Sequence, residues 1–300
     1  MKNALSVDLE DYYQVTAFAD SVGPANWNDR PSRIEANTEK LLQLFEEAAC
    51  HATFFTVGWI AEKYPKLVRR VAEAGHEIAC HSYLHRLVYS LSEVEFKQDT
   101  KRAKELLENA SGGAVYGYRA PSFSITVDSL WAFEVLAELG FTYDSSIYPI
   151  EHLNYGMPRG PRLPFRVQTS AGDIVEFPMP TVMFGKRRSP IGGGAYLRLL
   201  PYEFTRWGIR YINKNECHPV CIYVHPWELD VSQPKLRGSW TAHLRHYFGL
   251  KNTEAKMRRL LSDFELVPLG EIIGQLDTEP LDLAALFQPA NGNLDSQDKS

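Results

Sequence analysis

The sequence predicts an α/β fold in which helices cover a mostly parallel sheet, organised as one domain over residues 1–277. Short apolar runs alternate with amphipathic helical stretches along the chain, which is the pattern of repeated strand–helix units. The chain has 300 residues, of which 44% are hydrophobic and 23% charged, so it can build a large core. Chains of this length can form two domains, but α/β barrels of this size commonly form one.

Most of the expected elements lie in the first half of the chain. Short apolar or β-branched runs predict strands at 4–7, 52–57, 77–80, 115–118 and 141–143. Apolar residues spaced three and four apart predict helices at 37–49, 60–74, 92–107 and 127–139. Gly75 and Gly140 follow two of these helices, where a residue in the left-handed conformation commonly ends a helix.

The alternation resumes in the second half after an irregular middle. We expect strands at 174–177 and 220–224, and helices at 201–213 and 254–264. The segments at about 151–172 and 183–194 are rich in Gly, Pro and Arg, and we expect them to be irregular functional loops. Residues 278–300 are polar and cannot bury apolar area, which predicts a flexible tail.

Charge and cysteine content exclude several classes of protein. The net charge is −5, and no basic block stands out beyond Lys186-Arg187-Arg188, which argues against a nucleic-acid partner. Four cysteines are too few for a disulfide scaffold, so we expect reduced, buried thiols. The chain shows neither an apolar leader nor an apolar stretch of about 18 residues. We therefore expect a cytoplasmic protein with no transmembrane segment, with membrane association and oligomeric state left open.

Carboxylates and imidazoles gather after two of the predicted strands. Asp8, Glu10 and Asp11 follow the first strand, and His81 and His85 follow the third. An α/β barrel places its chemistry at these carboxyl ends. Two His residues separated by three others can face one way on a helical turn, and a nearby carboxylate would complete a site for one metal ion. Capping carboxylates and surface histidines are the alternative interpretation.

Three further polar residues end predicted strands. His225 follows the buried strand at 220–224 and is either a core histidine or a general acid or base. Arg119 and Asp144 each end another strand, where they could form structural salt bridges or act in catalysis. For Arg119 the functional role would be to orient a carboxylate.

Other catalytic patterns are absent or incomplete. The run 76–81 nearly matches the zinc-protease helix motif, but Cys80 stands in place of the second His. The sequence contains no nucleophile elbow and no P-loop. An iron oxygenase also uses two His and one carboxylate, but its usual all-β scaffold disagrees with the alternation of strands and helices.

Several segments together resemble the polysaccharide deacetylase family, also called the NodB-homology or carbohydrate esterase 4 family. The matching segments are 6–11, 81–85, 119–121 and 223–225. Segments 143–146, 191–194 and 225–228 resemble a subgroup found with exopolysaccharide and exosortase gene clusters. The resemblance implies a distorted (β/α)7–8 barrel and metal-dependent removal of N-acetyl groups from acetamido sugars.

The resemblance also implies roles for individual residues. Asp8 matches the general base, His225 the general acid, and Arg119 the residue that holds the catalytic Asp, while His81 and His85 match metal ligands. Asp144 joins the expected catalytic group.

Two departures from the family pattern affect the site. Leu9 stands where the family usually has a second Asp, which makes Glu10 the better metal ligand and leaves Asp11 as a rival. Ser122 follows Pro121 in place of the frequent Tyr, and its N–H can still donate to an oxyanion.

The expected function is removal of N-acetyl groups from the acetamido sugars of an exopolysaccharide or its precursor. The expected cofactor is one divalent metal ion, Zn²⁺ before Co²⁺ or Ni²⁺. The substrate is an N-acetylated glycan, and the expected substrate-binding residues are Pro121, Ser122, Tyr83 and Trp227. The alternatives are an amidohydrolase acting on a small ureide or cyclic amide, and a non-catalytic glycan-binding or assembly relative.

Overall fold

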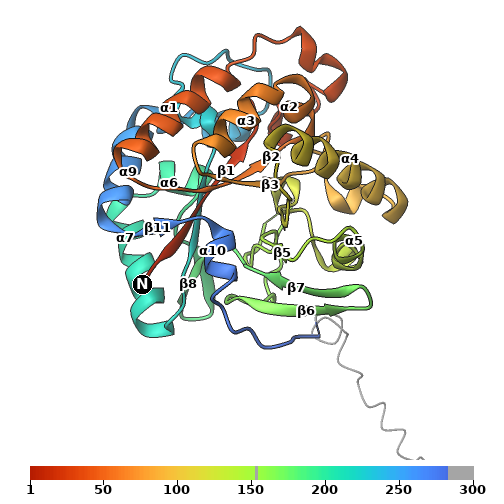
Figure 1. The fold of residues 1–300 in the computed structure, drawn as a ribbon. Helices are drawn as coiled ribbons and strands as arrows, with labels where there is room; N and C mark the ends of the chain where they lie inside the picture. The colour runs from red at the N-terminus through yellow and green to blue at the C-terminus, as the bar shows by residue number, and fades with distance from the viewer. Residues whose placement is uncertain (153–154, 283–300) are drawn as a thin grey trace, which may run out of the picture.

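A computed structural model describes residues 1–152 and 155–282 and shows a parallel sheet surrounded by helices (Figure 1). The sheet order is β10-β1-β2-β3-β4-β5-β7-β6, and β11 pairs with β1. All of these pairs are parallel except that of β6 with β7. The strands are β1 (Asn3–Leu9), β2 (Thr53–Thr56), β3 (Glu77–Cys80), β4 (Gly117–Tyr118), β5 (Tyr143–Asp144), β6 (Phe165–Thr169), β7 (Gly172–Glu176), β10 (Cys221–Val224) and β11 (Leu266–Val267).

Helices connect the parallel strands and lie around the sheet in Figure 1. They are α1 (Ile34–Glu47), α2 (Gly58–Lys63), α3 (Pro65–Glu73), α4 (Glu93–Ser111), α5 (Ala132–Glu138), α6 (Gly194–Leu199), α7 (Tyr202–Tyr211), α8 (Trp240–Tyr247), α9 (Leu250–Asp263) and α10 (Leu269–Ile273). A separate hairpin is formed by β8 (Thr181–Phe184) and β9 (Arg187–Pro190). Short 3-10 turns follow several strands, including Pro121–Phe123 and Pro226–Leu229.

The alternation of side chains along β1 gives the sheet two different faces. Leu5, Val7 and Leu9 are buried in the core shared with the helices. Ala4 belongs to a second cluster on the opposite face, with Phe55 of β2 among its members. Asp8 lies four residues after Ala4, near the carboxyl end of the strand. Because side chains alternate between the two faces, Asp8 lies on the same face as Ala4 and the second cluster.

The predicted α/β class and single domain agree with the structure, and so do the left-handed caps at Gly75 and Gly140. Among the described residues, β10 and β6 are the two outer strands of this sheet order. The helix predicted at 60–74 is two helices, because Pro65 lacks an N–H and begins a new helix after Tyr64. The helix predicted at 127–139 is reduced to a 3-10 turn followed by α5.

The two predicted irregular loops contain regular structure. The segment 151–172 includes β6, and 183–194 includes most of the β8–β9 hairpin. The start of the predicted flexible tail is held against β6, because Leu281 N–H donates to Arg166 O. Residues 283–300 of that prediction lie outside the described residues. Cys217 is exposed, which corrects the expectation that all four thiols are buried.

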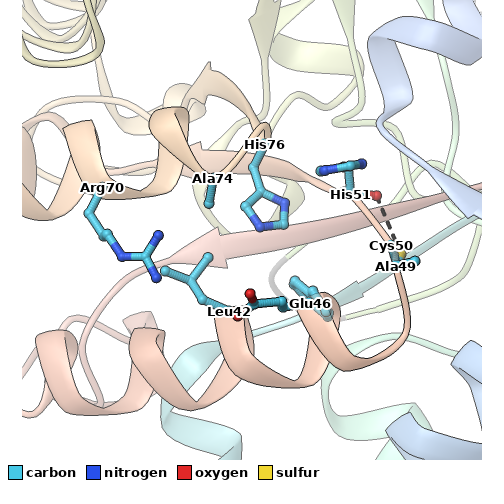
Figure 2. A pocket seen from close by; sticks show the side chains of 9 residues that line it. Leu42, Glu46, Ala49, Cys50, His51, Arg70, Ala74 and His76 are labelled. Atoms are coloured by element: carbon cyan, nitrogen blue, oxygen red, sulfur yellow. Dashed lines mark hydrogen bonds between the residues drawn. The ribbon is translucent and has the colours of Figure 1, made fainter.

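No helix among the described residues has the length and apolar character needed to cross a bilayer. A cavity of about 240 Å³ lies between α1, α3 and the starts of β2 and β3 (Figure 2). Its lining includes Arg70, His51 and His76 but none of the predicted site residues. It therefore lies at the amino ends of the strands, away from the carboxyl ends where the predicted chemistry gathers.

Candidate active site

The sheet order brings the predicted catalytic residues to one place. Strands β10, β1, β2, β3 and β4 are consecutive neighbours, and the polar residues stand at or just beyond their carboxyl ends. Asp8 and Glu10 come from β1, His81 from β3 and His225 from β10. This arrangement converts a wide separation along the sequence into one cluster of side chains.

Arg119 is the anchor of this cluster. Its side chain is fully buried, and Nη1 donates to Asp8 Oδ1 at 2.6 Å and to Ser6 Oγ at 2.8 Å. Nε donates to Ser145 O and Nη2 to Ser145 Oγ, both at 3.0 Å. The guanidinium also lies 4.1 Å from the centre of the Phe55 ring. A buried charge with this many partners is fixed in place, and it fixes the Asp8 carboxylate with it.

His225 faces the oxygen of Asp8 that Arg119 leaves free. His225 Nε2 lies 3.9 Å from Asp8 Oδ2 and 3.5 Å from Glu10 Oε1. Its other ring nitrogen, Nδ1, lies 2.9 Å from Glu228 Oε1. Burial is the largest influence on the pKa of His225 and lowers it, but the carboxylates of Glu228, Glu10 and Asp8 together raise it, and the net pKa is raised. The imidazole is therefore suited to hold a proton beside Asp8.

Glu10, His81 and His85 form the one group of possible metal ligands found among residues 1–152 and 155–282. One donor atom from each residue lies within 4.8 Å of the other two. Glu10 Oε2 is buried, and His85 Nε2 lies 2.8 Å from it. One buried carboxylate beside two imidazoles is a set of donors that suits a divalent transition metal. The donor set fits the predicted ion.

The orientation of His81 also suits a ligand. His81 Nδ1 lies 2.7 Å from Arg119 O, a contact that places the ring proton on Nδ1 and leaves Nε2 as the free acceptor. Burial is the main reason that the pKa of His81 is lowered well below its usual value, and His85 adds to the effect. The neutral form that binds metals is therefore the stable form.

The two histidines do not stand on a helical turn, which corrects the sequence-based expectation. Residues 81–85 form a loop in which Ser82 has a φ of 64° and His85 a φ of 52°. Asp99 of α4 stabilises this loop, because its Oδ2 accepts from Ser82 Oγ at 2.8 Å and from Tyr83 N–H at 2.7 Å. These left-handed residues reverse the chain and bring both rings to Glu10.

Glu10 and Asp11 differ in their hydrogen bonds, which favours Glu10 as the metal ligand. Asp11 Oδ2 accepts from Ser32 Oγ and Arg33 N–H, both at 2.8 Å, and Oδ1 accepts from Tyr12 N–H at 2.9 Å. Its oxygens thus hold the start of α1 in place, and Asp11 is not part of the Glu10–His81–His85 group. Asp11 is a structural residue in this fold.

Trp227 borders the same group, whereas the Ser122 side chain contacts Thr16. The Trp227 ring stacks on His225 with centroids 4.8 Å apart, and its Nε1 donates to Glu10 Oε1 at 3.4 Å. Ser122 follows the buried Pro121 in a 3-10 turn, with a left-handed φ of 51°, and its Oγ donates to Thr16 Oγ1 at 2.8 Å. Trp227 is buried, so it positions two polar side chains and offers little open surface for a sugar.

Two predicted site residues are not brought to this group. Asp144 is fully buried on β5, where it accepts from Ser146 and pairs with Glu176. The Tyr83 hydroxyl donates to Glu62 of α2 at 2.6 Å, and Arg102 of α4 covers its ring at 3.9 Å. Tyr83 is therefore held by helices α2 and α4, and Asp144 is held in a buried carboxyl pair with Glu176.

Sequence reasoning missed Glu228, which is completely buried behind His225. Its Oε1 also lies 3.4 Å from Nε of the buried Arg198, whose guanidinium donates to main-chain oxygens around the end of α8. The signal that could have identified it is its position three residues after His225, with Pro226 beginning a tight turn between them.

Family models match two parts of the chain. Residues 24–143 match the family described as "Polysaccharide deacetylase", and residues 145–274 match one described as "Domain of unknown function (DUF3473)". The first match contains His81, His85 and Arg119, and the second contains His225 and Glu228.

Curated relatives are similar over part of their length. A peptidoglycan-N-acetylglucosamine deacetylase from Bacillus cereus is 35% identical over 98 residues, which cover 32% of this chain and 36% of the relative. A peptidoglycan deacetylase from Helicobacter pylori is 28% identical over 145 residues, covering 44% of this chain and 47% of the relative. The chain thus spans between a third and a half of these relatives.

A solved structure from Mycobacterium smegmatis, described as a polysaccharide deacetylase, has a similar fold. It superposes with a TM-score of 0.62 at 20% identity and covers 94% of each chain. A structure described as Puue allantoinase superposes with a TM-score of 0.55 at 13% identity, covering 90% of this chain and 87% of that one. At these identities the likeness concerns the fold.

Proposed function

We propose that this chain, which carries a polysaccharide deacetylase domain, hydrolyses the N-acetyl group of acetamido sugars and releases acetate. The observation that carries the proposal is the pair of groups facing each other beside the Glu10–His81–His85 ligand set. Asp8 Oδ2 is a free acceptor, and His225 Nε2 is a donor 3.9 Å away. One accepts a proton and the other supplies one, as amide hydrolysis requires.

The metal expected in this site would be held by Glu10, His81 and His85, with Zn²⁺ the first choice and Co²⁺ or Ni²⁺ the alternatives. Such an ion would polarise the acetyl oxygen and lower the pKa of a water molecule. Trp227 orients Glu10, and the Arg119 carbonyl orients His81, so both ligands are supported by neighbouring residues.

The residues of the chain account for each proton in the reaction. Asp8, held by Arg119 through Oδ1, accepts the proton of the attacking water on Oδ2. The Ser122 N–H donates to the negative charge that develops on the acetyl oxygen. Protonated His225, supported by Glu228, then gives its proton to the sugar nitrogen as the carbon–nitrogen bond breaks. The products are acetate and a free amine.

The proposed substrate is an N-acetylated glycan of an exopolysaccharide or its precursor. Two kinds of observation support an acetamido sugar: the acid–base pair, and curated relatives named as deacetylases of peptidoglycan N-acetylglucosamine and of chitooligosaccharide. The resemblance of the segments around Asp144, Gly192 and His225 to the exopolysaccharide-associated subgroup supports the narrower choice.

The test is acetate release from N-acetylglucosamine oligomers, peptidoglycan fragments and an acetylated exopolysaccharide. The protein is assayed as purified, after chelation, and after addition of Zn²⁺ or Co²⁺. We expect acetate that disappears on chelation and returns with metal. Hydrolysis of allantoin or a cyclic amide without acetate release would instead support the ureide alternative. Absence of any turnover by metal-loaded protein across these substrates would support a non-catalytic glycan-binding relative.

A further inference from the structure

An exposed group of aromatic side chains lies on α7 and the β8–β9 hairpin, and we call it the aromatic row. It consists of Phe184, Phe204, Trp207 and Tyr211. Phe184 lies 5.6 Å from Trp207, and Trp207 lies 5.5 Å from Tyr211, measured between ring centroids. Phe184, Trp207 and Tyr211 are 50%, 42% and 36% exposed. The rings therefore cover one another only partly and present a continuous apolar surface.

The sequence of α7 explains why this surface faces outward. Thr205 and Ile209 are buried on the face toward the sheet, and Phe204, Trp207 and Tyr211 follow at helical spacing on the other face. The hairpin contributes Phe184 beside them, next to the exposed Met183. Exposed aromatic clusters of this kind mark interaction sites more often than single exposed apolar residues do.

Cations surround the aromatic row in a chain that is acidic overall. Residues 181–216 contain seven Lys and Arg residues and two acidic residues, Glu203 and Glu216. Of the cations, Arg198 is buried beside Glu228 and Arg206 pairs with Asp263, while Glu216 is paired with Arg162. Glu203 is already engaged by Arg259 at 2.8 Å. Lys186, Arg187 and Lys214 are exposed and have no recorded acidic partner in the described part of the chain. This face therefore carries a local positive charge against a net charge of −5.

We propose that the aromatic row and its surrounding cations bind the surface of an anionic lipid bilayer. Trp, Tyr and Phe side chains lie favourably at the boundary between headgroups and acyl chains. Lys and Arg near that boundary are attracted to anionic headgroups, and the attraction is screened by salt. Here one face of the protein supplies both contributions: the aromatic row supplies the apolar contact, and Lys186, Arg187 and Lys214 supply the charge.

The other occupants of such a face fit the charge less well. A second copy docked through a two-fold axis would bring the same face of each copy together and so gather the cations of both copies in one interface. A neutral sugar chain could stack on the aromatic rings but would leave the cations without a role. An anionic surface accounts for both features.

The position of the row keeps the candidate active site open. Asn3, at the amino end of β1, exchanges hydrogen bonds with Asn213 just beyond α7 at 3.0 and 2.9 Å. The carboxyl end of the same strand carries Asp8. Figure 1 likewise shows α7 beside the start of the chain. The proposed contact is therefore separate from the acetamide-hydrolysing group and does not depend on the proposed function.

The test is co-sedimentation of the full chain with vesicles of phosphatidylcholine alone or with about a third phosphatidylglycerol. We expect binding to the anionic vesicles at low salt and its loss at high salt. The double variant Lys186→Glu/Arg187→Glu should lower the partition coefficient at least tenfold, since each charge near the surface contributes about fivefold. Trp207→Ser should weaken binding several-fold.

Trp240→Ser is the matched control, because Trp240 is 76% exposed on α8 outside the row. It should bind like the unaltered chain, and circular dichroism should show all variants folded. Absence of binding to anionic vesicles at low salt would overturn the proposal. Binding that the Lys186, Arg187 and Trp207 variants leave unchanged would also overturn it. So would a dimer that Trp207→Ser dissociates, since the row would then be covered by a second copy.

Discussion

Arg119 binds Asp8 through a single carboxylate oxygen, with Nη1 2.6 Å from Oδ1, and leaves Oδ2 facing His225. Both side chains are buried from water, so each charge is stabilised by the other. Arg119 also donates hydrogen bonds to Ser6 Oγ and Ser145 Oγ. The hydrogen bond from Arg119 therefore fixes which oxygen of Asp8, the proposed general base, faces His225.

Arg119→Lys tests this relationship. An ammonium group cannot reproduce the planar set of donors, so Asp8 loses its fixed direction and Ser145 loses its partner. We expect kcat to fall by about a hundredfold and the thermal midpoint to drop, while the metal content of the purified protein is retained. Arg166→Lys is the control, because Arg166 pairs with Asp173 at the surface. It should change neither kcat nor the thermal midpoint. Near-normal turnover by Arg119→Lys would show that Asp8 needs no such anchor.

Glu10→Gln and Asp11→Asn separate the metal ligand from the structural carboxylate. Glu10→Gln removes the charge from the Glu10–His81–His85 group, so we expect the stoichiometry of bound Zn²⁺, measured by elemental analysis, to fall far below one. Asp11→Asn should keep the metal but lower stability by about 1–3 kcal/mol, because Ser32, Arg33 and Tyr12 donate to that carboxylate. The reverse pattern would identify Asp11 as the ligand.

Glu228→Gln tests whether the buried carboxylate supports the proton donor. The change weakens the charge opposite His225 Nδ1 and also leaves the Arg198 guanidinium without its nearest anion. We expect kcat to fall tenfold or more, with KM and metal content nearly unchanged. Glu254→Gln, on the exposed surface of α9, provides the comparison. A loss confined to stability, with kcat intact, would limit Glu228 to a structural role.

The buried pair of Asp144 and Glu176 predicts a pH dependence of stability. Burial is the largest reason that the pKa of Glu176 is raised well above 4.5, and Asp144 adds to it. The Glu176 and Asp144 carboxyl groups hydrogen-bond each other, which requires one of them to keep its proton. The native state thus holds a proton that the unfolded chain releases above about pH 4.3. Its stabilising contribution is complete below that pH and is lost as pH rises toward the raised pKa.

Glu176→Gln keeps the side chain neutral at every pH and removes this dependence. We expect thermal midpoints measured between pH 5 and pH 8 to fall less steeply for the variant than for the unaltered chain. The exposed Glu105→Gln should leave the slope unchanged. A variant with the original slope would show that the pair does not hold a shared proton.

The sequence was most informative where the strands are fully buried. The apolar runs before Asp8, His81 and His225 predict strands β1, β3 and β10, and a parallel sheet necessarily collects their carboxyl ends. The hairpin β8–β9 was missed because its apolar residues stand in one block in β8 and its polar residues in another in β9, so no alternation of apolar and polar residues marks it.

Side-chain directions were the part of the site that the sequence could not supply. Glu10 and Asp11 are neighbours, and only the loop that follows β1 decides which of them faces the histidines. Left-handed backbone at Ser82 and His85 has no signature in those residue types, so a helical turn was the natural expectation. The positions of Tyr83 and Asp144 outside the Glu10–His81–His85 group could not be predicted for the same reason, because their partners come from distant elements.

The most direct measurement is the rate of acetate release from N-acetylglucosamine oligomers by metal-loaded Asp8→Asn compared with the unaltered chain. Asparagine keeps the shape and the contact with Arg119 but cannot accept the proton of the attacking water. If Asp8 and His225 form the acid–base pair, the rate falls by about a hundredfold or more, while metal content is retained and the thermal midpoint falls because the buried Arg119 loses its compensating charge. A rate within a few-fold of the unaltered chain would contradict the assignment of Asp8 as the general base.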